Sequence, residues 1–99
     1  MRYEIILAPE AVEDLEGLKA NIRAEVREGM ETHLRHKPRK IGRSRIKKLR
    51  KLSQPQFRLR IGEIRVFYDV SEENVEVLAI MPKSETEKWL AKFGNPESK

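Results

Sequence analysis

The feature that most constrains this chain is a pair of alternating apolar and polar runs separated by two residues. The first run covers Gln56–Ile61, the loop is Gly62 and Glu63, and the second run covers Ile64–Val70. A two-residue loop that begins with glycine is typical of a type II′ β-hairpin. The predicted cross-strand pairs are Ile61 with Ile64, Arg60 with Arg65, Leu59 with Val66, Arg58 with Phe67, and Phe57 with Tyr68.

This pairing sorts the hairpin into an apolar face and a basic face, because side chains alternate along a strand. The basic face carries Arg58, Arg60 and Arg65, and we expect it to point away from the core. Like charges opposed across two strands cost up to about 1 kcal/mol. An ordinary solvent-exposed face would more often carry charges of both signs. Three arginines on one face therefore favour a site for an anion. The apolar face comprises Phe57, Leu59, Ile61, Ile64, Val66, Tyr68 and Val70.

The distribution of charge supports an anionic partner. Residues 32–62 contain twelve Lys or Arg and no Asp or Glu, a charge of +12, whereas the rest of the chain carries −7 and the whole chain +5. Such an asymmetric field suits a polyanion or an acidic protein. The chain has no cysteine, which excludes disulfides and thiolate metal sites. It also shows no membrane-spanning run and no signal peptide, so we expect one cytoplasmic domain over residues 1–99.

The first half of the chain predicts a strand and two helices. Residues 2–7 read as a strand, and Pro9 opens a helix whose buried stripe would be Ala11, Val12, Leu15 and Leu18. A break near Asn21, a plausible cap, precedes a second helix that ends by Lys37, before a proline. The two helices would form an antiparallel hairpin. The buried stripe of the second helix is Ile22, Val26, Met30 and Leu34.

The remaining segments complete an α+β prediction. Residues 45–52 fit either a strand or a short helix, a turn follows at residues 71–74, and residues 75–81 predict a central strand covered on both faces. Ser84 and Glu87 predict a capping box for a C-terminal helix with Gly94 as its C-cap, and residues 95–99 look frayed. The expected fold is an N-terminal strand, an αα-hairpin, a twisted antiparallel sheet of about three to four strands and a short C-terminal helix.

Two histidines near the end of the second predicted helix have an ordinary explanation. His33 and His36 lie three residues apart, but no third ligand is nearby. Cations at a helix C-terminus complement the helix dipole. We therefore predict no metal site there.

The order of elements and the hairpin motif together resemble the RelE/ParE superfamily of toxins from bacterial and archaeal toxin–antitoxin modules. The likeness covers nearly the whole chain, and its most specific part is the second hairpin strand, Ile64–Val70. The resemblance implies a small basic toxin held inactive by an acidic antitoxin. The RelE branch cuts mRNA in the ribosomal A site, using the RNA 2′-hydroxyl as nucleophile, with no metal and no small-molecule cofactor. The ParE branch instead targets DNA gyrase.

The same resemblance assigns roles to single residues. Arg65 falls on the family's hairpin arginine, which contacts the scissile phosphate. Arg58 and Arg60 replace two lysines that RelE-type toxins commonly carry, and arginine cannot serve as a base because it keeps its proton. Lys83 is then the best available base, since neighbouring positive charges would favour its neutral form.

Two further positions depart from the RelE pattern. Ser84 stands where the family often has an arginine, and Leu90 stands where RelE proteins use a tyrosine to stack a base, with Trp89 beside it as the nearest aromatic. The first hypothesis is therefore a ribosome-dependent mRNA endoribonuclease, with mRNA and the ribosomal A site as partners. The alternative is a ParE-type gyrase inhibitor, or a homologue that binds RNA or antitoxin without cutting. The candidate RNA-binding residues are Arg43, Arg45, Lys47, Lys48, Arg50, Lys51 and Trp89.

Overall fold

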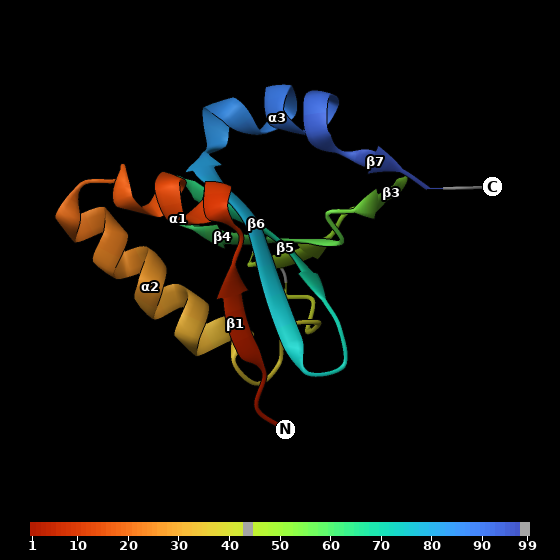
Figure 1. The fold of residues 1–99 in the computed structure, drawn as a ribbon, viewed down its shortest axis with the longest axis horizontal. Coiled ribbons are helices and arrows are strands. Elements are labelled where there is room, and N and C mark those ends of the chain that lie inside the picture. The colour runs from red at the N-terminus through yellow and green to blue at the C-terminus, as the bar shows by residue number, and fades with distance from the viewer. Residues whose placement is uncertain (43–44, 98–99) are drawn as a thin grey trace.

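The computed structural model describes residues 1–42 and 45–97. A short 3-10 turn, Lys83–Glu85, joins the last long strand to the C-terminal helix. Figure 1 shows two helices beside a twisted sheet and a third helix crossing the top of the molecule. The elements in chain order are β1 (Glu4–Leu7), α1 (Pro9–Glu16), α2 (Ala20–Leu34), β2 (Ile46–Lys48), β3 (Leu52–Gln54), β4 (Phe57–Ile61), β5 (Ile64–Val70), β6 (Asn74–Pro82), α3 (Thr86–Phe93) and β7 (Asn95–Pro96).

The main sheet has five strands in the order β1-β6-β5-β4-β2. Three of its pairs are antiparallel, but β1 runs parallel to β6, with Ile5 opposite Val75. The sheet is therefore larger than the predicted antiparallel sheet of about three to four strands, and one of its pairs is parallel. The helical pair α1–α2 carries the chain away between β1 and the later strands, and such a long connection allows a parallel return. The predicted central strand is confirmed, because β6 lies between β1 and β5.

The larger core lies between one face of the sheet and the helices α1 and α2. All seven residues of the predicted apolar hairpin face are buried in it, together with Val26, Met30 and Leu34 of α2. The Tyr68 ring stacks on Phe57 at 5.5 Å between ring centroids, and its hydroxyl donates to the Pro38 carbonyl at 2.6 Å. This bond ties the segment after α2 to the middle of the sheet.

Both helices follow their predicted positions, with two corrections. Pro9 is the first residue of α1, and α2 ends at Leu34, before Pro38. Val12 was expected to be buried but is 40% exposed, because it lies at the margin of the α1 face that packs on the sheet. Asn21 is not the cap of α2, since the N-cap position is Lys19 and no side chain caps the helix.

A smaller core lies on the opposite face of the sheet, beneath α3. Phe67, Ala79 and Met81 are buried there. The half-buried side chains that pack against them are Leu49, Trp89 and Leu90. The predicted capping box was wrong, because no side chain caps α3 or the preceding 3-10 turn. The 3-10 turn displaces the helix start to Thr86, whose hydroxyl donates to the Lys83 carbonyl at 2.9 Å.

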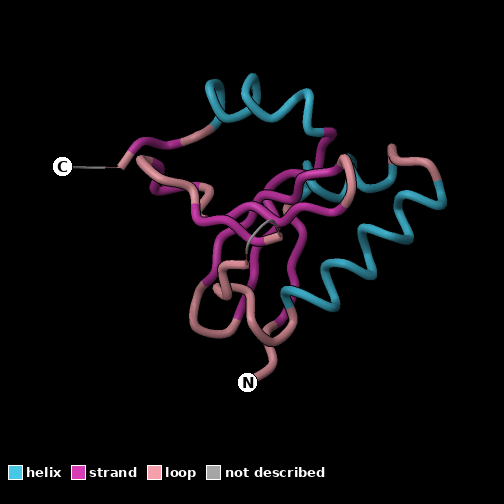
Figure 2. Tube along the Cα trace, turned by 180° about the vertical axis from the view of Figure 1, so that it is seen from behind, coloured by secondary structure: helices cyan, strands magenta, loops and turns pink. Residues whose placement is uncertain are grey.

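The C-terminal segment is anchored at both ends of α3. At its start, the Lys83 amide donates to the Glu63 carbonyl at 2.8 Å, next to the hairpin loop. At its end, β7 pairs with β3, and the Glu97 amide donates to the Lys51 carbonyl at 3.0 Å. The prediction of a frayed end was therefore wrong for residues 95–97, because they pair with β3 and with the turn that precedes it. Figure 2 shows α3 arching over the sheet between these two attachments.

Candidate functional site: a basic groove beside the hairpin

The β4–β5 hairpin has the predicted register at all five pairs. Gly62 has a φ of +57°, whereas Glu63, the second loop residue, does not share this left-handed conformation. Positive φ at the first loop position alone fits a type II′ turn. Arg60 consequently lies opposite Arg65, and Arg58 lies opposite Phe67.

The three hairpin arginines differ in burial. Arg60 is exposed, Arg58 is half-buried and Arg65 is only 7% exposed. The Nη1 atom of Arg65 donates to the Gly62 carbonyl at 2.9 Å and to the Ile64 carbonyl at 3.2 Å. Arg65 lies on the face away from the α1–α2 core, as expected, but its burial was not predicted and arises because the guanidinium folds back against its own loop. Its position is therefore fixed before any ligand arrives.

Positive charge is concentrated at this hairpin. Burial lowers the pKa of Arg58, and the charges of Arg65 and Arg60 lower it further. An arginine with a lowered pKa remains a cation near neutral pH. The three guanidinium groups therefore keep three like charges together, at an electrostatic cost that an anion would offset.

An open groove of about 910 Å³ gathers these arginines with cations from other elements. Lys47 comes from β2, where it pairs with Arg58, and Lys83 comes from the junction between β6 and α3. Among the described residues that line the groove there is no Asp or Glu. Its cationic residues are Lys47, Lys48, Arg50, Arg58, Arg60, Arg65 and Lys83.

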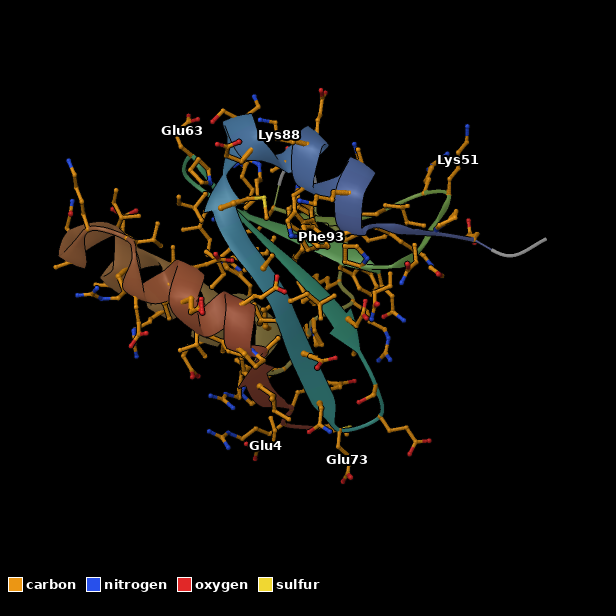
Figure 3. The ribbon with its side chains drawn as sticks, turned by 45° about the horizontal axis from the view of Figure 1, so that its top comes forward. Glu4, Lys51, Glu63, Glu73, Lys88 and Phe93 are labelled. Carbon is orange, nitrogen blue, oxygen red and sulfur yellow. The ribbon has the colours of Figure 1, made fainter. Side chains whose placement is uncertain are left out.

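Lys83 is a groove cation that lies beside the hairpin loop. Its side chain is exposed. The hydrogen bond from its backbone amide to the Glu63 carbonyl holds the backbone beside the hairpin loop. Figure 3 shows Glu63 at this loop, close to the start of α3. Lysine can act as a base whereas arginine keeps its proton, so the groove residues of a type suited to that role are Lys47, Lys48 and Lys83.

Among the described residues, three of the predicted RNA-binding residues lie outside the groove. Arg43 falls outside the described residues. Arg45 lines a neighbouring depression at the end of α2. Lys51 lies in the turn before β3, on the right in Figure 3, across the molecule from Glu63 at the hairpin loop. Trp89 stacks on Phe67 at 5.1 Å between ring centroids and lines a depression on the other side of α3.

The comparisons with known proteins agree with this architecture. Residues 5–87 match the sequence model of a family described as the ParE toxin of the type II toxin–antitoxin system parDE. The chain belongs to this toxin family. No curated protein matches the sequence.

Solved structures place the toxin among RelE-like proteins. A chain of the RelBE2 toxin–antitoxin complex from Mycobacterium tuberculosis is 25% identical with a TM-score of 0.71, and the match covers 83% of this chain and 99% of that one. A free-state double arginine-to-alanine variant of Escherichia coli RelE is 20% identical with a TM-score of 0.70, covering 90% and 92%. A chain of the RelB–RelE complex from Methanococcus jannaschii is 16% identical with a TM-score of 0.65, covering 85% and 96%. The predicted RelE/ParE superfamily and α+β fold are thus confirmed.

Sequence reasoning missed the apolar wall of the toxin's groove. Phe67 and Leu90 line it beside the cations, so a bound chain would contact both charged and apolar groups. Alternation along β5 could have revealed Phe67, because it places this residue on the same face as Arg65. The resemblance points to Leu90 only as the position of a base-stacking tyrosine, and its place in the groove depends on how α3 crosses the sheet.

The described part of the toxin contains neither a candidate metal site nor a membrane-spanning helix. Within it, no group of three or more His, Asp or Glu side chains could hold a metal ion. No helix of this part has the length and apolar character needed to cross a membrane.

Proposed function

We propose that this toxin is a ribosome-dependent mRNA endoribonuclease of RelE type, which binds mRNA in the groove beside the β4–β5 hairpin. The observation that carries the proposal is the groove itself, where seven cations meet with no carboxylate among the described lining residues. Phosphates interact with such a surface through charge and hydrogen bonds. The apolar side chains of Phe67 and Leu90 would contact the bases or sugars.

The groove supports phosphodiester cleavage by positioning and charge. In the proposed reaction the RNA 2′-oxygen attacks the neighbouring phosphorus, a 2′,3′-cyclic phosphate forms, and the bond to the 5′-oxygen breaks. Arg65 is held rigidly by its loop, so its donors can stabilise the charge that develops on the phosphate oxygens without reorganising. Arg58 and Arg60 bind the flanking phosphates. Neutral Lys83 accepts the hydroxyl proton, and water protonates the leaving oxygen.

A second candidate function is inhibition of DNA gyrase, as the ParE name of the matching family suggests. Arg58 and Arg60 favour this candidate, because arginine binds anions but cannot act as a base that removes the proton of the RNA 2′-hydroxyl. The two functions differ in their target rather than in the fold. In either case we propose an acidic antitoxin as the partner in the cell, and the cytoplasm as the place of action.

The deciding experiment exposes ribosomes and gyrase to the same preparation of toxin. The endoribonuclease proposal expects mRNA cleavage on ribosomes, seen as new 5′ ends by primer extension, and unchanged DNA supercoiling by gyrase. Arg60→Gln toxin should cut poorly, whereas Lys88→Gln toxin should cut normally, because Lys88 lies outside the groove. Loss of supercoiling with intact mRNA would instead support the gyrase function.

A further inference from the structure

A second basic depression lies next to the groove, at the end of α2. Its volume is about 340 Å³. No Asp or Glu is among the described residues that line it. Its titratable lining residues are His33, His36, Lys37, Lys40 and Arg45.

The two depressions adjoin at one edge of the sheet. Gly42 and Ile46 line both of them. Ile46 begins β2, the edge strand of the five-stranded sheet, and its buried side chain faces the α2 core. The next residue, Lys47, pairs with Arg58 and lines the groove on the opposite face. A chain that follows the positive charge would therefore pass around β2 from one face to the other.

The dipole of α2 explains only part of this cluster. Cations near a helix C-terminus are stabilising, which accounts for Lys37. Arg45 comes from a different segment, just before β2. Arg45 and His33 line the same depression, where burial lowers the pKa of His33 and the charge of Arg45 lowers it further. The lowered pKa favours the neutral form of His33, so the positive charge of the depression comes from Lys37, Lys40 and Arg45.

We propose that this depression is a second phosphate subsite, in which a single RNA strand leaving the groove continues around β2 and meets Lys40 and Arg45. The inference rests on the proposed function, because the groove must hold RNA for the strand to continue from it. The subsite adds affinity for longer RNA and takes no part in the cleavage chemistry. It also fixes the direction in which the strand leaves the groove.

The test compares a short oligouridylate that fills the groove alone with a longer one that reaches the subsite, each binding to toxin without ribosomes. The double variant Lys40→Gln/Arg45→Gln should weaken binding of the longer probe and leave the short probe unchanged. For the longer probe, the slope of log affinity against log salt concentration should become shallower by roughly 1.4 in this variant. Two phosphate contacts are lost, and each contact with single-stranded RNA contributes about 0.7 to the slope. Lys19→Gln/Arg27→Gln is the matched control, because these exposed cations line neither depression.

The outcomes separate the subsite from the groove. Equal weakening of the longer probe by the two double variants, with normal binding of the short probe, overturns the subsite alone. Failure of the short probe to bind, or its insensitivity to Arg60→Gln, overturns RNA binding in the groove and the subsite with it. Circular dichroism and the Tm check folding. The single variant Arg45→Lys should keep most of the stronger binding of the longer probe, because lysine keeps the positive charge.

Discussion

Arg60 and Arg65 stand directly opposite each other across the β4–β5 hairpin, yet one is exposed and the other almost completely buried. Arg65 is held by two carbonyl groups of its own loop, so its position does not depend on a ligand. Arg60 stays in solvent on the same face. The pair therefore places a buried, fixed cation beside an exposed one, which suits the binding of a phosphate from two sides.

Arg60→Gln should make the protein more stable while impairing its activity. The substitution removes a like-charge pair across two strands, so the free energy of unfolding should rise by up to about 1 kcal/mol at low salt. Urea unfolding monitored by circular dichroism measures this change. Added salt should shrink the difference, because it screens exposed charges. A destabilised Arg60→Gln protein would show that Arg60 has a structural role and would weaken the case for an anion site.

Arg65→Ala should abolish toxicity and also cost stability. The variant loses two hydrogen bonds of a buried guanidinium, so we expect a loss of about 1–3 kcal/mol in the free energy of unfolding. Arg65→Lys separates the two effects, because lysine keeps the charge but not the planar fork of donors. Growth arrest on induction and urea unfolding are the measurements. Full toxicity of a folded Arg65→Ala protein would remove this arginine from the site.

Lys83→Met should reduce mRNA cleavage much more than ribosome binding. A general base contributes about 100-fold or more to a rate, whereas one exposed cation contributes little to binding a large partner. Cleavage on ribosomes and cosedimentation with them provide the two readouts. Lys88→Met is the control, since Lys88 belongs to α3 but does not line the groove. Parallel losses of cleavage and binding would assign Lys83 to electrostatic attraction only.

Tyr68→Phe should destabilise the fold at neutral pH without affecting the groove. The Tyr68 hydroxyl is the donor to the Pro38 carbonyl, and Pro38 is buried, so its loss should cost about 1–3 kcal/mol. Ribosomal cleavage, measured below the unfolding transition, should stay at the parent level. A large loss of cleavage by a folded Tyr68→Phe protein would contradict this separation.

Tyr68 also predicts a decline of stability at alkaline pH. Burial raises the pKa of Tyr68 well above its ordinary value, so above pH of about 10 the unfolded chain loses this proton while the folded chain keeps it. The free energy of unfolding therefore falls as the pH rises above about 10. The fall should be smaller in Tyr68→Phe, and urea unfolding across this range measures it. Identical pH profiles would show that other groups control alkaline unfolding.

The acidic antitoxin proposed as the partner would neutralise the toxin by covering the arginines or by displacing α3. None of the residues of α3 is fully buried, and its two attachments are short, so displacement is physically accessible. Hydrogen exchange of toxin with and without antitoxin distinguishes the two. New protection confined to β4 and β5 indicates masking, whereas faster exchange across Thr86–Phe93 indicates displacement. Unchanged exchange in both stretches would place the antitoxin elsewhere.

Local sequence was sufficient to predict the elements whose partners are close along the chain. The alternation from Phe57 to Val70 and a two-residue loop determined every pair of the hairpin, because a shift by one residue would have turned the apolar face into solvent. Proline and apolar spacing likewise located α1 and α2. The same alternation brought Arg58, Arg60 and Arg65 to one face, so the centre of the candidate site was predictable.

Only the tertiary structure decided features that depend on distant contacts. The parallel pairing of β1 with β6, the β7 partner of β3 and the path of α3 all join segments far apart in the chain. These contacts place Lys83 and Leu90 in the groove and Trp89 outside it, and the turn geometry buries Arg65. Side-chain alternation indicates which face a residue occupies, but which segment covers that face depends on the packing of the whole chain.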